Sequence, residues 1–261
     1  MLSLRQATVG LRSPVNPPIL HGVDFSGADQ GGLHKIRIAT LESGNVRLAR
    51  ADRGQLLRSI IDSSASAERH IWRIDAPVGL PLATLRAHGV REEWLASAKW
   101  ALDSGSPRAW RSMMRSISRE EPRRRADIEA RTPMAPMNLR IFKQTWTLMC
   151  EVLLPLHAAG VSIVPMAPTA SNAMVCEGCP SSVLQRRGWP ARGYKGSGGP
   201  PREVRHTILQ KLMGTGLRVP PRIAAEAEED EEGDALDALL LLTPPQVTVV
   251  PREALVEGWV Y

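Results

Sequence analysis

Acidic residues at the ends of short apolar runs are the side chains of this 261-residue chain best placed to do chemistry. Three of them each close a predicted strand. Two more open the last predicted helix, three residues apart, so that both side chains lie on one side of it. In chain order, these acids are Asp24, Asp75, Glu177, Asp234 and Asp237.

The chemistry that such acids predict is metal binding. In an open α/β sheet, ligands bind where strands end and loops meet. Carboxylates that converge there repel one another unless they are protonated or bind a cation. Oxygen donors suit Mg²⁺ and Mn²⁺, and two such ions can hold a phosphodiester and activate a water. The predicted cofactor is therefore Mg²⁺ or Mn²⁺, and the predicted metal ligands are Asp24, Asp75, Asp234 and Asp237.

Simpler structural roles remain open for the same residues. An Asp at a strand end often forms a turn, and Asp234 in particular can be the N-cap of its helix. Cys176 and Cys179 form a single Cys-x-x-Cys, which is at best half of a zinc site and otherwise a pair of buried thiols.

The elements that must position the acids can be predicted from hydrophobic periodicity. Three consecutive antiparallel strands, a helix and a fourth strand open the fold, and Ser43 and Gly44 mark a hairpin between the second and third strands. The ranges are 19–25, 33–41, a run around 46–48, the helix 53–63, and His70–Asp75.

A helical insertion at about 85–158 follows, with a loop at 119–137. Its clearest helix, 138–156, carries an apolar stripe at spacings of three and four that includes Leu139 and Trp146. Two short strands (161–165 and 173–177) and three helices (180–187, 202–213 and one from about 233) complete the order. We expect a loose leader at 1–18 and one domain over 19–261, an α/β fold with a mixed sheet and flanking helices.

The distribution of charge favours a polyanionic partner. Residues 108–143 carry ten Arg and Lys against four acids, and residues 185–222 carry nine against one. We expect nucleic acid as the partner, DNA or RNA, bound through phosphates. The candidate phosphate ligands are Lys195, Arg186, Arg187 and Arg205, although each can also be an ordinary surface cation. The acidic run 226–232 predicts a solvated loop or a frayed helix end.

Hydropathy and cysteine content bear on location. No apolar run approaches the length of a membrane span, and the first 18 residues lack the apolar centre of a signal peptide. Three cysteines fit a reducing compartment. The expectation is a cytoplasmic protein without membrane contact.

Short motifs in a fixed order give the chain a family resemblance. The motifs that contain the candidate acids are GVDFSG at 22–27, IDAPVGLP at 74–81, EGCP at 177–180 and GDALDA at 233–238. Further matches are TPMAPMN at 132–138 with Gln144, YKG at 194–196 and EGW at 257–259. Over residues 19–261 this order resembles the family known as domain of unknown function 429, which consists of predicted nucleases.

The resemblance implies a ribonuclease H-like fold and a metal-dependent nuclease that hydrolyses phosphodiester bonds. It implies catalytic roles for Asp24, Asp75, Asp234 and Asp237, with Glu177 as a further acid of the family. The alternative is a member of the same fold that binds nucleic acid or a nucleotide without catalysis.

Overall fold

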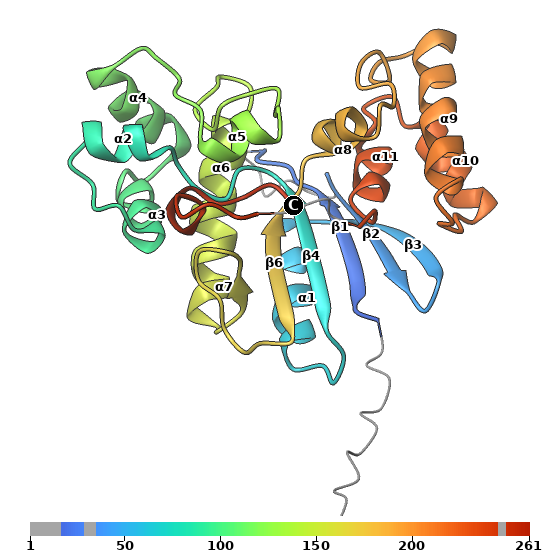
Figure 1. Cartoon of the computed structure of the whole chain (residues 1–261), viewed down its shortest axis with the longest axis horizontal. Coiled ribbons are helices and arrows are strands. Elements are labelled where there is room, and N and C mark those ends of the chain that lie inside the picture. Colours follow the sequence, from blue (N-terminus) through green and yellow to red (C-terminus); the bar gives the residue numbers. More distant parts are fainter. Residues whose placement is uncertain (1–16, 29–34, 245–248) are drawn as a thin grey trace, which may run out of the picture.

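A six-stranded mixed sheet organises the part of the chain that the computed structural model describes, which is residues 17–28, 35–244 and 249–261 (Figure 1). The strand order is β3-β2-β1-β4-β6-β5. The first three strands are antiparallel, whereas β4, β6 and β5 extend the sheet from β1 in parallel. The bounds are β1 Ile19–Asp24, β2 Ile36–Glu42, β3 Asn45–Ala51, β4 His70–Asp75, β5 Ser162–Ile163 and β6 Ala173–Glu177. This is the ribonuclease H-like layout expected from the sequence.

The hairpin between β2 and β3 turns at the predicted residues. Ser43 and Gly44 have φ angles of 48° and 80°, and Glu42 pairs with Asn45 across the turn. Positive φ at both central residues is the geometry that matches the twist of a two-residue hairpin.

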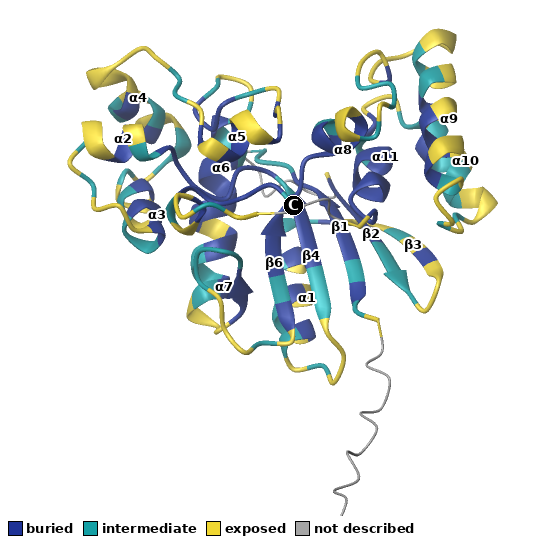
Figure 2. Cartoon of the chain, in the orientation of Figure 1, coloured by how far each residue is buried: buried dark blue, intermediate teal, exposed yellow. Residues whose placement is uncertain are grey.

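Helices cover both faces of the sheet. Ile38 and Ala39 are consecutive in β2 and therefore point to opposite faces. Ile38 belongs to a core with the helix at 53–64 and the helical column at 142–158, and Ala39 to a second core with the helices at 199–213 and 234–240. Figure 2 shows that β1 and β6 are mostly buried, whereas β3 at the edge of the sheet is largely exposed. The helices before β5 are α1 Arg53–Ser64, α2 Leu82–Ala87, α3 Trp94–Asp103, α4 Pro107–Ile117, α5 Arg125–Glu129, α6 Phe142–Thr147, π-helix η1 Leu148–Leu153 and α7 Leu154–Ala158. Those after β6 are α8 Pro180–Arg186, α9 Gly199–Met213, α10 Pro221–Glu229, α11 Asp234–Leu240 and α12 Ala254–Glu257.

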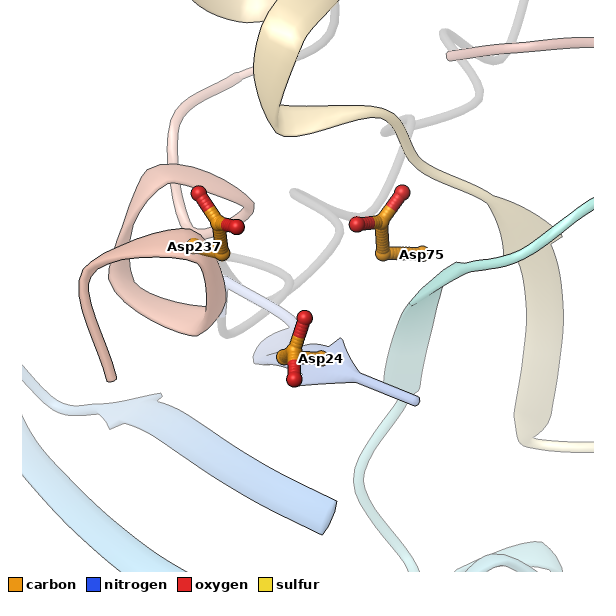
Figure 3. A group of neighbouring side chains, drawn as sticks. All are labelled: Asp24, Asp75 and Asp237. Carbon is orange, nitrogen blue, oxygen red and sulfur yellow. The ribbon is translucent and has the colours of Figure 1, made fainter. Parts of the chain in front are cut away.

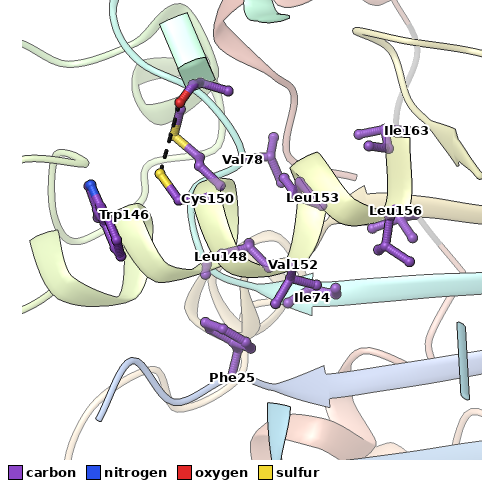
Figure 4. Packing of buried hydrophobic residues seen from close by; sticks show 14 of the residues in the cluster. Phe25, Ile74, Val78, Trp146, Leu148, Cys150, Val152, Leu153, Leu156 and Ile163 are labelled. Atoms are coloured by element: carbon purple, nitrogen blue, oxygen red, sulfur yellow. Dashed lines mark hydrogen bonds between the residues drawn. The ribbon is translucent and has the colours of Figure 1, made fainter. Parts of the chain in front are cut away.

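The helix predicted over 138–156 starts later and is interrupted. It begins at Phe142, so Leu139 lies before it and is 65% exposed, which corrects its place in the apolar stripe. The middle of the column is the π-helix η1, which ends two residues before Pro155. Proline has no N–H to donate and its ring crowds the carbonyl four residues earlier, so a wider turn relieves the conflict. Figure 4 shows side chains of η1 packed with Ile74 and Phe25.

One further segment differs from the sequence prediction, because the expected loop at 119–137 contains the short helix α5. The acidic run 226–232 lies at a helix end, one of the two expected alternatives, since α10 ends within it at Glu229. Residues 1–16 of the expected leader lie outside the described residues. Among the described helices, none combines the length and the apolar character needed to cross a bilayer.

Candidate metal centre

Three aspartates from separate elements meet at the carboxyl end of the sheet. Asp24 and Asp75 close β1 and β4, and they are register partners in the parallel pair. Asp237 lies in the first turn of α11. One carboxylate oxygen from each lies within 4.8 Å of the others, and Figure 3 shows the three side chains around a common space. We call Asp24, Asp75 and Asp237 the aspartate cluster.

Close packing of α11 on β1 places Asp237 beside Asp24. A Cβ on Gly22 would lie only 2.1 Å from the carbonyl oxygen of Ala238, so only glycine allows this approach. The motif GVDFSG therefore contains both the metal-ligand candidate and the residue that allows the helix to pack over it.

The electrostatics of the aspartate cluster favour a cation. Burial raises the pKa of Asp24 well above its usual value, and the charges of Asp237, Asp234 and Asp75 raise it further. Burial and then Asp237 raise the pKa of Asp75. Burial also raises the pKa of Asp237, which Lys195 opposes. Each shift means that the ionised form is disfavoured until a proton or a cation compensates it.

Asp234 lies beside the aspartate cluster without belonging to it. Its side chain is half-buried and lines the same cleft. The suggestion that Asp234 is the N-cap is wrong, because the cap is Gly233, with φ 76°. Instead, the Asp230 carboxylate accepts a 2.8 Å hydrogen bond from the backbone N–H of Ala235. The sequence analysis missed Asp230, which the acidic run concealed.

Glu177 closes β6 as expected but is paired with an arginine. The Arg124 guanidinium donates to both of its oxygens, at 2.7 and 2.6 Å. Arg124 also donates to both oxygens of Asp127, at 2.7 and 3.1 Å, and all three residues are buried. Burial raises the pKa of Glu177, and Arg124 opposes that rise. We call Arg124, Asp127 and Glu177 the arginine network. Its internal pairing gives Glu177 a structural partner.

The four predicted phosphate ligands have different surroundings. The Lys195 ammonium lies in the cleft, 2.7 Å from Asp237 Oδ2. Arg205 is buried, and it donates to the carbonyls of Tyr194, Gly196 and Glu228, so it holds the loop that carries Lys195.

The other two candidates lie at the far end of α8. Arg186 and Arg187 line a small hollow with Arg73 and are not among the residues that line the cleft at the aspartate cluster. Arg187 lies over the ring of Trp189 at 5.2 Å. Arg73, which the sequence analysis did not single out, is buried and donates to the carbonyls of Leu241, Thr243 and Tyr261.

Gln144 ties the two strand ends together. Its amide donates to the carbonyls of Phe25 and Asp75, the latter at 3.0 Å. A Cβ on Gly27 would lie 2.5 Å from the Gln144 backbone, so this glycine permits the contact. In the sequence, Gln144 stood out only through its match to the family motif, and its spacing alone indicated no role.

The three cysteines are buried free thiols. Burial raises the pKa of both Cys176 and Cys179 to about 12, so neither is a ready thiolate. Within the described ranges, the aspartate cluster is the group of at least three acidic, histidine or cysteine side chains with metal-binding geometry. Within these ranges, no further ligands complete a zinc site with Cys176 and Cys179.

The cleft above the aspartate cluster has a volume of about 980 Å³. Cations from several elements line it, including Lys35, Arg50, Arg140 and Lys195. Exposed cations and the carboxylates of the aspartate cluster therefore line the same cleft. Comparisons with protein-family models, with curated proteins and with solved structures find no match to this chain.

Proposed function

We propose that this protein is a metal-dependent nuclease that hydrolyses phosphodiester bonds of nucleic acid. The observation that carries the proposal is the meeting of Asp24, Asp75 and Asp237, from β1, β4 and α11, at one end of a ribonuclease H-like sheet. The resemblance of its motifs to the domain of unknown function 429 family supports the same activity, and membership of that family is part of the proposal.

The donor set fits Mg²⁺ or Mn²⁺. All three donors are carboxylate oxygens, which these hard ions prefer over the nitrogen and sulfur ligands of zinc sites. The distances between the donor atoms, within 4.8 Å, allow ligands of one ion or of two adjacent ions. Asp234 borders the cleft and is available as a further metal ligand or as a hydrogen-bond acceptor for metal-bound water.

Each part of the cleft has a role in this proposal. Asp24, Asp75 and Asp237 hold the metal, which supplies Lewis acidity and an activated water when it is bound. The cations Lys35, Arg50 and Arg140 on the walls hold the phosphate backbone. Gln144 fixes the ends of β1 and β4, so the carboxylates keep their spacing. The arginine network lines the same cleft and fixes Glu177 at the end of β6.

A cleavage screen tests the proposal. Labelled single-stranded and duplex DNA, single-stranded RNA, an RNA–DNA hybrid and a branched DNA are incubated with wild type in Mg²⁺, in Mn²⁺ or in EDTA. We expect cleavage of at least one substrate with metal and none in EDTA. Asp24→Asn should reduce the rate at least about 100-fold, because the amide keeps the shape but loses the charge that holds the ion.

The matched control is Asp103→Asn, which makes the same change at an exposed acid at the end of α3. It should cut like wild type. Cleavage by Asp24→Asn at the wild-type rate would contradict the assignment. Salt-sensitive binding without cleavage under any metal condition would favour the non-catalytic nucleic-acid-binding alternative.

A further inference from the structure

Both oxygens of Asp237 already have protein partners. The Tyr194 hydroxyl donates to Oδ1 at 2.9 Å, and the Lys195 ammonium lies 2.7 Å from Oδ2. The side chain of Asp237 is only 2% exposed, whereas that of Lys195 is 50% exposed. A cation anchored on the solvent side therefore reaches down to a buried carboxylate of the candidate metal centre.

The surrounding structure is built to present Tyr194 and Lys195 in this position. The buried Arg205 holds the carbonyls on both sides of Lys195, and Gly196 N–H donates to the Glu231 carbonyl at 2.7 Å. At Gly233, a Cβ would lie 3.2 Å from the Tyr194 ring and 3.4 Å from the Lys195 side chain. The loop thus fits closely against the first turn of α11.

The charge balance of the aspartate cluster gives this contact a consequence. Within the described residues, the ion pairs supply a cation to Asp237 but none to Asp24 or Asp75. One ammonium cannot balance three carboxylates, so a need for further positive charge remains. The Lys195 ammonium nevertheless occupies the coordination space next to Asp237 Oδ2 and repels any cation that approaches this oxygen.

We propose that Lys195 is a built-in counterion of the metal centre, which occupies the cation position beside Asp237 in the metal-free protein and competes there with the divalent ion. This inference rests on the proposed function. The stem of Lys195 is flexible and its side chain is half-exposed. The ammonium can therefore leave Asp237 and be hydrated by solvent when the ion binds. The lysine then remains in the cleft, where a phosphate oxygen is a suitable new partner.

The test measures metal binding without substrate. Wild type, Lys195→Gln and Arg140→Gln are titrated with Mn²⁺ by calorimetry, and each is melted in EDTA and in saturating Mn²⁺. Arg140 is the matched control, because it is an exposed cation that lines the same cleft. We expect Lys195→Gln to bind Mn²⁺ about tenfold more tightly and to melt about 4 °C lower in EDTA, since the substitution removes an ion pair that only the metal-free protein contains.

Saturating Mn²⁺ should bring the melting temperature of Lys195→Gln back to that of wild type. Arg140→Gln should shift the affinity less than about twofold. Equal or weaker Mn²⁺ binding by Lys195→Gln would overturn the inference and make Lys195 a bystander or a residue that orients Asp237. If wild type itself binds no Mn²⁺, the proposed function fails, and that result is distinct from wild-type binding that the lysine substitution leaves unchanged.

Discussion

The cleft holds two groups of buried acids that differ in how their charge is balanced. In the arginine network, Arg124 gives bidentate hydrogen bonds to both Glu177 and Asp127. In the aspartate cluster, three carboxylates share a single half-exposed ammonium. In the arginine network, one guanidinium offsets one of two negative charges and donates hydrogen bonds to both carboxylates, so this group contributes to the fold. In the aspartate cluster, one ammonium faces three carboxylates and pairs with only one of them, so this group favours binding a further cation from solution.

The largest expected difference is in the stability of the metal-free protein. Glu177→Gln should lower the free energy of unfolding by about 3 kcal/mol, because an amide nitrogen replaces one of the two oxygens that accept from Arg124, so that a buried guanidinium N–H faces another donor. Asp24→Asn should raise it by about 1 kcal/mol, because it removes repulsion at a functional site. Urea unfolding in EDTA measures both. Loss of stability in both variants would show that the two groups are alike, and would contradict the comparison.

The second-largest expected difference between the two groups is in how their variants respond to metal ions. At 100 times the dissociation constant, Mg²⁺ or Mn²⁺ should stabilise wild type by about 2.7 kcal/mol, because the ion binds only the folded arrangement. Asp24→Asn should lose this gain. Glu177→Gln should keep it, although it starts from a lower melting temperature. Thermal melts over a range of ion concentrations decide the point, and a gain that survives in Asp24→Asn would place the ion elsewhere.

A pH dependence should follow from the raised pKa values of the aspartates. The folded protein holds protons on these groups at pH values where the unfolded chain has released them. The contribution of these aspartates to the stability of the metal-free protein is therefore greatest below the ordinary aspartate pKa, near pH 4, and is lost as the pH rises through the raised values. One proton held over one pH unit corresponds to about 1.4 kcal/mol.

Unfolding free energies in EDTA at pH 5 and pH 8 test this expectation. Wild type should lose more stability between the two than Asp24→Asn, and saturating Mg²⁺ should remove most of the difference at pH 8. Stability that rises with pH equally in both proteins would show that the aspartates are not under mutual strain.

The smallest expected effect concerns the cations that hold phosphates. Replacing Lys35, Arg50 and Arg140 by Gln should flatten the dependence of nucleic-acid affinity on salt, by roughly 0.7–0.9 in the log–log slope for each phosphate that the variant no longer neutralises. Replacing Arg186 and Arg187 should change the slope less, because they lie outside the cleft. An equal or larger change for the α8 pair would extend the binding surface over that helix.

Much of the frame could be predicted from local sequence. Alternation predicted the second and third strands, a short apolar run predicted the first, and Ser43-Gly44 predicted the hairpin. The positions of Asp24 and Asp75 at strand ends followed from where each apolar run stops. The start and interruption of the α6–η1–α7 column did not, because an apolar stripe shows which residues face the core but not how the helix accommodates Pro155.

The sequence by itself determined which acids stand at the ends of elements, because strand and helix patterns are local. Only the tertiary structure decided which of these acids have a cation as partner. Glu177 and Arg124 are 53 positions apart, and Lys195 reaches Asp237 of α11 from the loop between α8 and α9. Such pairs depend on how α11, β6 and the segment before α5 pack together, and a buried charge is set by neighbours within a few ångströms rather than by neighbours in the chain.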